Sequence, residues 1–285
     1  MFSWLPKQVK SRMKGCYKGL RADYVRRRYA FTSHDLIALL RRVGVKLGDV
    51  LLVHSSFDEF QGFAGNPTDV ILALQEAVGC SGTLLMPTSP FTGTAVDYVS
   101  THPVFDVSKT PSRMGLITEL FRRSPGVMRS VHPTHAVAAW GANAPEIVKD
   151  HHLADTPCGR HTPYGRLLDC DGKILFLGTD IDVMTFFHTV EEELERRMPF
   201  SPFTTQVFSL VCKDKDGNSL QANTRLFAPD YSRRRNLDTL VPVLKHTGYW
   251  NEASVGKLKV ILLRVNEVLK ACHSLADQGV FCYDA

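Results

Sequence analysis

Residues 173–179, Lys-Ile-Leu-Phe-Leu-Gly-Thr, are followed closely by residues 188–191, His-Thr-Val-Glu. The first stretch is short, apolar and bounded by glycines, which is typical of a buried strand. The segment from about 185 to 197 is rich in Glu and Arg and predicts a helix. On a helix, His188 and Glu191 share one face because they lie one turn apart. This pattern indicates either a base with its orienting carboxylate or an ordinary surface histidine.

Strand and helix patterns alternate on both sides of this stretch. Residues 204–212 and 219–225 flank the turn Asp-Lys-Asp-Gly-Asn, which predicts a β-hairpin. Residues 89–112 show no clear periodicity and predict a long polar loop. The alternation favours an α/β fold with a mixed central sheet flanked by helices and a C-terminal β-hairpin insertion. The other expected strands are 49–54, 83–88, 136–140 and 258–264, and the expected helices include 33–44, 68–78, 114–123, 145–150, 236–245 and 265–276.

The positive charge of the chain is concentrated at its beginning. The whole chain carries +5, whereas residues 1–28 hold nine basic residues against one acidic residue, so this segment is +8 and the remainder −3. We therefore expect a basic N-terminal arm over 1–30 and a single domain over 31–285. The arm suits an anionic membrane surface, a protein partner or a solvated helix packed on the body. Nucleic acid is not expected, because no recognition motif accompanies the charge.

The overall composition is that of a soluble globular protein. Hydrophobic residues make up 44% of the 285 residues and charged residues 22%. No apolar run approaches the roughly 18 residues of a spanning helix. The seven cysteines are scattered without a Cys-x-x-Cys pair, which favours reduced thiols, no structural zinc or other metal, and a cytoplasmic location. Peripheral contact with the inner membrane surface and a homo-oligomeric state both stay open.

Several separate segments match one family pattern in order. They read Val-His-Ser-Ser at 53–56, Gly-Thr-Leu-Leu-Met-Pro-Thr at 82–88, Thr-Pro-Ser-Arg-Met-Gly at 110–115, His-Pro-Thr-His at 132–135 and Thr-Phe-Phe-His-Thr-Val-Glu at 185–191. Over roughly residues 33–265 the chain resembles the aminoglycoside 3-N-acetyltransferase family. The resemblance implies that family's α/β fold and the transfer of an acetyl or short acyl group from acyl-CoA to an amine. It also implies direct attack in a ternary complex, without an acyl-enzyme or a metal.

The resemblance assigns roles to individual residues. His188 is the expected general base, and Glu191 is expected to orient its ring. Glu119 and Asp106 are expected near the amine acceptor. Contacts with CoA are expected where a strand ends and where a helix begins, since hydroxyls and free N–H groups lie there. These expected CoA contacts are Ser55, Ser56, Ser112, Met114 and Gly115.

The expected acceptor follows from where the chain departs from the drug-modifying members. The segment 151–166 places Arg160, His161 and Arg166 in one loop, which would repel a polycation. We therefore expect an amino sugar or a related small amine, with these side chains at its rim. The alternatives are a true aminoglycoside 3-N-acetyltransferase that confers antibiotic resistance and a catalytically quiet, membrane-associated scaffold. A serine hydrolase is disfavoured because neither Ser55 nor Ser56 lies in a Gly-x-Ser-x-Gly elbow.

Overall fold

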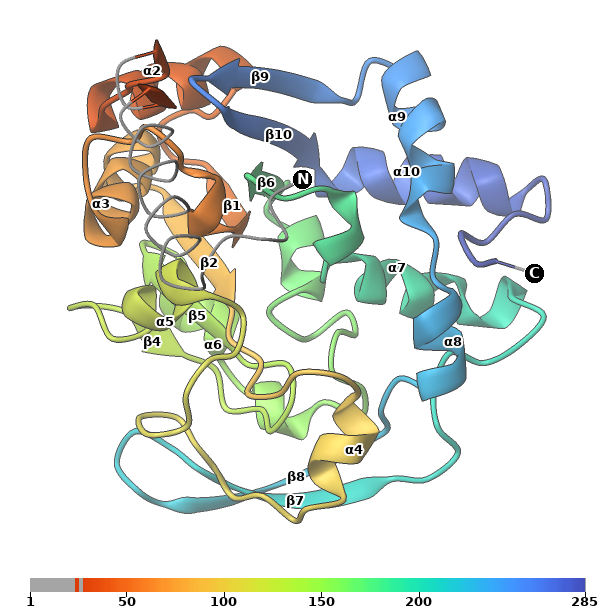
Figure 1. Cartoon of the computed structure of the whole chain (residues 1–285). Coiled ribbons are helices and arrows are strands. Elements are labelled where there is room, and N and C mark those ends of the chain that lie inside the picture. Colours follow the sequence, from red (N-terminus) through yellow and green to blue (C-terminus); the bar gives the residue numbers. More distant parts are fainter. Residues whose placement is uncertain (1–23, 26–27, 285) are drawn as a thin grey trace, which may run out of the picture.

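The computed structural model describes residues 24–25 and 28–284, and these residues form a seven-stranded mixed sheet (Figure 1). Its three middle strands run parallel, and the strands outside them run antiparallel to their neighbours. The predicted mixed central sheet is confirmed. In spatial order the strands are β4 (Met128–Arg129), β5 (Val137–Gly141), β2 (Thr83–Pro87), β1 (Val50–Ser55), β6 (Lys173–Leu177), β10 (Leu258–Arg264) and β9 (Asn251–Val255).

The register of β1 and β6 brings two chain segments to the same edge of this sheet. Ser55 pairs with Leu177 at the carboxyl ends of the two parallel strands. The residues that follow each strand therefore begin side by side, and Ser56 N donates a hydrogen bond to Leu177 O at 3.0 Å. The loop after β6 leads into α7 (Phe187–Leu194), so this edge also receives His188. Ligands of open α/β sheets commonly bind at this carboxyl edge.

Helices cover both faces of the sheet because successive strand side chains point to opposite sides. Leu52 and Phe176 belong to one buried apolar cluster, whereas Leu51 and Leu175 belong to the other. The second cluster includes side chains from α2 (Ser33–Val43), α3 (Pro67–Val78) and α5 (Leu116–Phe121), and the first includes side chains from α6 (Ala144–Val148), α7, α9 (Val241–His246) and α10 (Val265–Ala276).

A second, three-stranded sheet lies below the main sheet in the view of Figure 1. It consists of β3 (Phe105–Asp106), β7 (Phe208–Lys213) and β8 (Ser219–Thr224), and β7 and β8 form the predicted hairpin. The prediction of an unstructured loop over 89–112 was wrong, because this segment contains β3 and α4 (Ala95–Val99). α4 is too short for a helical period, and β3 pairs with a strand more than a hundred residues away.

The other boundaries differ only in part from those predicted. The strand over 258–264 and the helix over 265–276 are confirmed at both ends. The predicted helix over 185–197 is shorter, since α7 ends at Leu194 and a 3₁₀ turn follows. β9 and α8 (Pro229–Arg234) were not predicted. β9 is an edge strand whose side chains are exposed or half-buried, so it lacks the apolar run of an inner strand.

The basic arm predicted over 1–30 falls outside the described residues except at positions 24, 25 and 28–30. Its predicted role and the domain boundary near residue 30 therefore stay predictions. Within 24–25 and 28–284, no helix has both the length and the apolar character needed to cross a bilayer.

Candidate active site

The structure brings the predicted pair on α7 together. His188 Nδ1 lies 2.7 Å from Glu191 Oε2, one turn further along the helix. The imidazole also stacks on Phe227, with ring centroids 4.0 Å apart, and the rings of His135 and His188 meet edge to face at 5.4 Å. Only 16% of the His188 side chain is exposed. The ring is thus held by a carboxylate, a stacked aromatic ring and a second imidazole.

Glu191 is held by two further side chains that the sequence did not reveal. Its carboxylate is 1% exposed. Arg235 donates from Nε to Oε1 at 2.9 Å and from Nη2 to Oε2 at 3.2 Å, and the Tyr283 hydroxyl donates to Oε1. Arg235 and Tyr283 lie 44 and 92 residues away in the chain, and no local pattern connects them with α7.

These contacts set the protonation of both partners. Burial opposes ionisation of Glu191, but Arg235, His188 and Tyr283 together hold its pKa below the ordinary value. Burial, and then the charge of Arg235, lower the pKa of His188, against the opposing effect of Glu191. A neutral imidazole beside an ionised carboxylate donates from Nδ1. The lone pair of His188 is then on Nε2, and no hydrogen bond from the described residues engages this atom.

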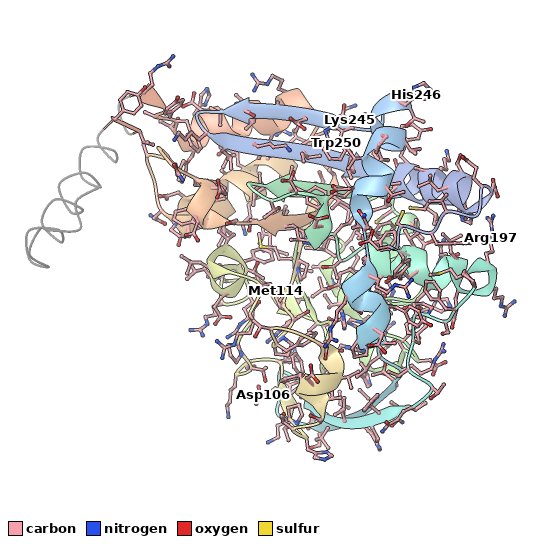
Figure 2. The ribbon with its side chains drawn as sticks, turned by 45° about the vertical axis from the view of Figure 1, so that its right-hand side comes forward. Asp106, Met114, Arg197, Lys245, His246 and Trp250 are labelled. Carbon is pink, nitrogen blue, oxygen red and sulfur yellow. The ribbon has the colours of Figure 1, made fainter. Side chains whose placement is uncertain are left out.

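Two of the predicted CoA contacts, Ser55 and Met114, line one cavity of about 260 Å³ at the ends of β1 and β6. Figure 2 labels Met114. Three buried polar atoms in its wall, His54 Nε2, Ser55 Oγ and Thr179 Oγ1, have no hydrogen-bond partner among the described residues. Burial lowers the pKa of His54 to about 3, so its ring is neutral. Gly115 adjoins this cavity, since a Cβ there would lie 3.6 Å from Ser55 O.

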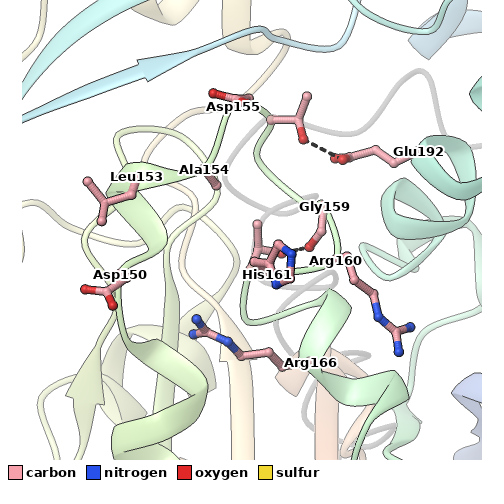
Figure 3. A pocket seen from close by; sticks show the side chains of 11 residues that line it. Asp150, Leu153, Ala154, Asp155, Gly159, Arg160, His161, Arg166 and Glu192 are labelled. Carbon is pink, nitrogen blue, oxygen red and sulfur yellow. Dashed lines mark hydrogen bonds between the residues drawn. The ribbon is translucent and has the colours of Figure 1, made fainter.

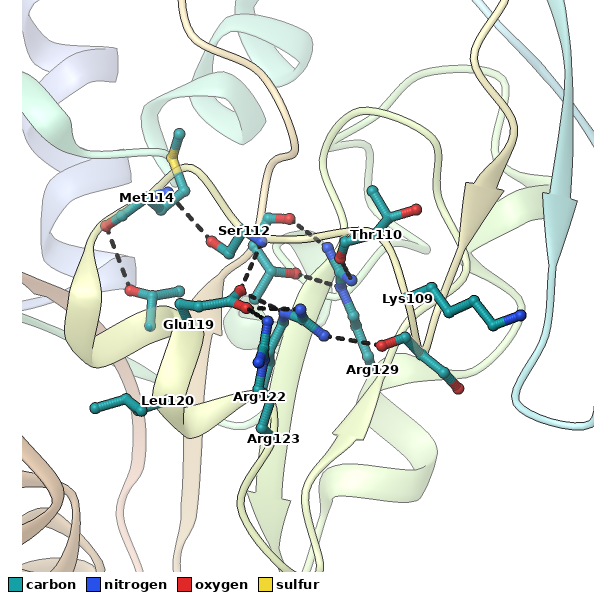
Figure 4. Close-up of polar contacts among 12 residues, drawn as sticks. Lys109, Thr110, Ser112, Met114, Glu119, Leu120, Arg122, Arg123 and Arg129 are labelled. Carbon is teal, nitrogen blue, oxygen red and sulfur yellow. Dashed lines mark hydrogen bonds and ion pairs between the residues drawn. The ribbon is translucent and has the colours of Figure 1, made fainter.

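The other two predicted CoA contacts do not line this cavity. Ser112 is buried, and its hydroxyl accepts a hydrogen bond from Met114 N at 3.1 Å (Figure 4). Ser112 thereby shapes the turn that presents Met114. Ser56 begins the 3₁₀ turn over Phe57–Glu59 without a side-chain cap.

The two carboxylates predicted near the acceptor are engaged by their own neighbours. Glu119 binds Arg122 in a bidentate pair at 2.5 and 2.7 Å, and it also pairs with Arg123 (Figure 4). It further accepts a hydrogen bond from Ser112 N at 2.8 Å. Asp106 Oδ1 accepts hydrogen bonds from two backbone N–H groups of the following turn, both at 2.9 Å. In this arrangement both carboxylates hold loops in place.

The side chains predicted at the acceptor rim surround a second cavity of about 480 Å³ (Figure 3). Arg160, His161 and Arg166 line it, but the two arginines have protein partners. Arg160 pairs with Asp169 at 2.5 Å. Arg166 donates to the carbonyls of residues 146, 147 and 149 and so closes the end of α6. The electrostatic argument against a cationic acceptor is therefore weaker than the sequence implied.

Acidic side chains line the same cavity. They are Asp150, Asp155 and Glu192. Glu192 accepts hydrogen bonds from Thr156 Oγ1 at 2.5 Å and from Cys158 N at 3.1 Å, and burial raises its pKa to about 7. It lies one turn beyond His188 on α7, so this cavity reaches the helix of the predicted base. No group of three metal-ligating side chains occurs within the described ranges.

The comparisons with known proteins agree with this geometry. Residues 52–276 match the family described as aminoglycoside 3-N-acetyltransferase. Aminoglycoside N(3)-acetyltransferase IX of Micromonospora chalcea is 33% identical over 172 residues, which are 56% of this chain and 59% of that protein. The chain thus spans about three fifths of the length of that relative. The prophage-derived aminoglycoside N(3')-acetyltransferase-like protein YokD of Bacillus subtilis is 30% identical over 200 residues, 65% of this chain and 72% of that protein.

A solved structure extends the likeness over almost the whole fold. The crystal structure of the aminoglycoside acetyltransferase AAC(3)-IVa, as apoenzyme, superposes with a TM-score of 0.73 at 28% identity. The match covers 90% of this chain and 93% of that chain. The predicted family is confirmed: this chain belongs to the aminoglycoside 3-N-acetyltransferase family.

Proposed function

We propose that this protein transfers an acetyl or short acyl group from acyl-CoA to the amine of an amino sugar or a related small molecule, with His188 as general base. The observation that carries the proposal is the buried pair of His188 and Glu191, which leaves Nε2 of the imidazole without a partner among the described residues. The names of the relatives support acetyl transfer to an amine.

The chemistry of the proposed step follows from the state of the pair. The bound donor supplies an acyl group as a thioester. An amine attacks only as its free base, and its excess proton must leave as the new C–N bond forms. Nε2 of the neutral His188 accepts that proton, and the ionised Glu191 stabilises the resulting imidazolium through Nδ1. The C–S bond breaks, and the thiolate leaves without an acyl-enzyme.

The cavity at the ends of β1 and β6 suits the pantetheine part of the donor. Pantetheine carries amide N–H and C=O groups along an apolar chain. The wall offers three polar atoms that have no hydrogen-bond partner in the described part of the chain: His54 Nε2, Ser55 Oγ and Thr179 Oγ1. Arg113, which the sequence did not single out, lines the same cavity and supplies a cation for the phosphates. The proposed CoA contacts at Ser56, Ser112, Met114 and Gly115 rest on the family resemblance.

The test of the donor site is acetyl-CoA binding by Ser55→Ala. Because Ser55 Oγ makes no hydrogen bond within the described residues, the variant should keep its stability. Loss of one hydrogen bond to the ligand should raise the dissociation constant about fivefold. Ser100→Ala, at an exposed serine directly after α4, is the control. Unchanged affinity of Ser55→Ala for acetyl-CoA would remove this cavity from the proposal.

The test of the reaction is thiol release from acetyl-CoA with and without an amine. Amine-dependent release supports acyl transfer, and release without an amine supports the hydrolase. No release with any acceptor supports the scaffold alternative.

A polycationic aminoglycoside is a second candidate acceptor, because Asp150, Asp155 and Glu192 line the cavity beside α7. The relatives' names point the same way. The first candidate, a mono-amino sugar, is favoured by Arg160 and His161 at the rim. The ratio of kcat/KM for kanamycin-type drugs and mono-amino sugars decides between the two, and a higher value for the drugs identifies a resistance enzyme.

The basic arm carries a separate proposal about location. We propose a cytoplasmic protein whose residues 1–28 contact an anionic membrane surface, because this segment carries +8. The matching test is sedimentation with anionic and neutral vesicles, using the full chain and a variant without residues 1–28. Equal binding by both proteins would refute the membrane role, and a gel-filtration mass would establish the oligomeric state.

A further inference from the structure

The His188–Glu191 pair presents an electrostatic conflict. An ionised carboxylate 2.7 Å from an imidazole normally favours the protonated ring. A protonated ring cannot accept the proton of an attacking amine. In this structure the balance runs the other way, because burial and Arg235 outweigh Glu191 and lower the pKa of His188. The site therefore needs groups that counter the field of the carboxylate.

Two hydrogen-bond donors on Glu191 come from chain segments that lie far from α7. Arg235 follows α8, and Tyr283 lies beyond residue 276, where the family match ends. Both donate to the carboxylate, which is 1% exposed. The guanidinium of Arg235 also comes within 3.4 Å of His188 Nδ1, so its positive charge acts directly on the imidazole.

A short backbone pairing holds these two donors side by side. Arg235 and Tyr283 form an antiparallel bridge. Asn236 N donates to Cys282 O at 2.8 Å, and Asp284 N donates to Arg234 O at 2.7 Å. The ring of Tyr283 also packs edge to face on Phe200, with centroids 5.0 Å apart. Residues 282–284 are thus fixed by backbone and ring contacts that do not involve the hydroxyl of Tyr283.

We propose that Arg235 and Tyr283 are positioning residues for the general base: they hold and neutralise the Glu191 carboxylate so that it orients His188 without keeping a second proton on its ring. This inference rests on the proposed function in one respect only, the role of His188 as base. It assigns a function to residues 282–284, which lie outside the part of the chain that matches the family.

The remaining groups around the pair do not supply this neutralisation. His135 faces His188, and burial holds its pKa well below the ordinary value, so it adds no positive charge at neutral pH. Cys158 and Cys282 are the other titratable groups that act on Glu191. Neither thiol can carry a positive charge. Arg235 and the hydroxyl of Tyr283 are therefore the groups that offset the carboxylate.

The sharpest test is Tyr283→Phe, which removes the donor and keeps the ring. With one donor lost, the carboxylate acts more strongly on His188 and favours its protonated form. The acid limb of the kcat/KM profile should then move up by about one pH unit. Activity at pH 6 should fall severalfold, activity at pH 9 should stay near that of the unchanged protein, and the KM for acetyl-CoA should not move.

Tyr231→Phe is the matched control. Tyr231 stacks face to face on the same Phe200 ring, with centroids 4.1 Å apart, and no hydrogen bond of its hydroxyl occurs among the described residues. Its profile should coincide with that of the unchanged protein. Arg235→Lys keeps a charge but loses the bidentate fork, so it should shift the acid limb in the same direction as Tyr283→Phe.

A titration of the His188 ring by NMR separates this inference from the proposed function. The ring should protonate at a higher pH in Tyr283→Phe than in the unchanged protein, whether or not any acceptor is acetylated. An inactive protein with this shift would overturn the proposed function and leave the positioning role intact. An unshifted ring would overturn the positioning role, and so would an activity loss of equal size at every pH.

Discussion

Glu191 and Glu192 are neighbours in the chain, but their side chains point from α7 into two different environments. Glu191 meets the charges of Arg235 and His188, and its pKa falls below the ordinary value. Glu192 accepts hydrogen bonds from the hydroxyl of Thr156 and from a backbone N–H, and burial outweighs these bonds and the charge of Arg225, so its pKa rises to about 7. Both carboxylates are largely buried. The difference shows that the charge of the partners, and not burial alone, decides which carboxylate stays ionised.

The two carboxylates therefore suit different tasks. A carboxylate that stays ionised can orient and stabilise His188 throughout the neutral range. Glu192, at the wall of the 480 Å³ cavity, changes its charge within that range. The wall of the cavity gains a negative charge as the pH rises through about 7, because Glu192 loses its proton. This charge favours a cationic acceptor at alkaline pH.

The largest expected effect concerns the base that Glu191 serves. His188→Ala should lower turnover by about two to four orders of magnitude, because no other group replaces the proton acceptor. Acetyl-CoA binding, measured by calorimetry, should not change. His246→Ala, an exposed histidine on α9 (Figure 2), is the control. Near-normal turnover of His188→Ala would show that the His188–Glu191 pair does not take part in the reaction.

The next effect separates the neighbouring carboxylates directly. Glu191→Gln leaves Arg235 without its ionised partner and should lower the free energy of unfolding by about 3 kcal/mol. Glu192→Gln should cost much less at pH 7, because a neutral amide can replace a carboxyl that is about half protonated at that pH. Urea unfolding of both variants measures the difference, with the exposed Glu193→Gln as control. Equal losses of unfolding free energy in Glu191→Gln and Glu192→Gln would contradict the difference between the two carboxylates.

The third prediction uses the pH dependence of Glu192. Its pKa is about 7 in the folded state, against an ordinary value of 4.5 for a solvated glutamate, so the folded state binds the proton more tightly. Stability should therefore fall as the pH rises from 4.5 to 7, by about 2–3 kcal/mol from this group. Glu192→Gln should flatten that slope in urea unfolding at a series of pH values. An identical slope in both proteins would contradict the raised pKa.

The smallest expected effect tests how a hydrogen-bond donor changes the pKa of Glu192. The hydroxyl of Thr156 donates to its carboxylate and so lowers the pKa that burial raises. Thr156→Val should raise that pKa further, as a ¹³C NMR titration of the carboxyl would show. It should also cost about 1 kcal/mol of stability at pH 8, where the carboxylate is charged. Thr247→Val removes a hydroxyl at the exposed residue that caps the end of α9 and donates to Val243 O, and it should leave the titration unchanged.

Local pattern alone was sufficient for much of the fold. The apolar run at residues 173–177 is β6 with the predicted bounds, and the strand over 258–264 and the helix over 265–276 are equally accurate. The contact between His188 and Glu191 was also predictable, because a helix brings residues three apart onto one face. These features depend on short stretches of chain whose periodicity and turns are visible in the sequence.

The surroundings of the site needed the tertiary structure. Arg235 and Tyr283 reach Glu191 from 44 and 92 residues away, and the sequence around them carries no sign of that contact. The opposite titration of Glu191 and Glu192 likewise depends on partners that only folding supplies. The sequence by itself determined the family, the sheet and the histidine–glutamate pair. Packing decided which carboxylate is ionised and which cations are already paired, because long-range contacts and desolvation have no local signature.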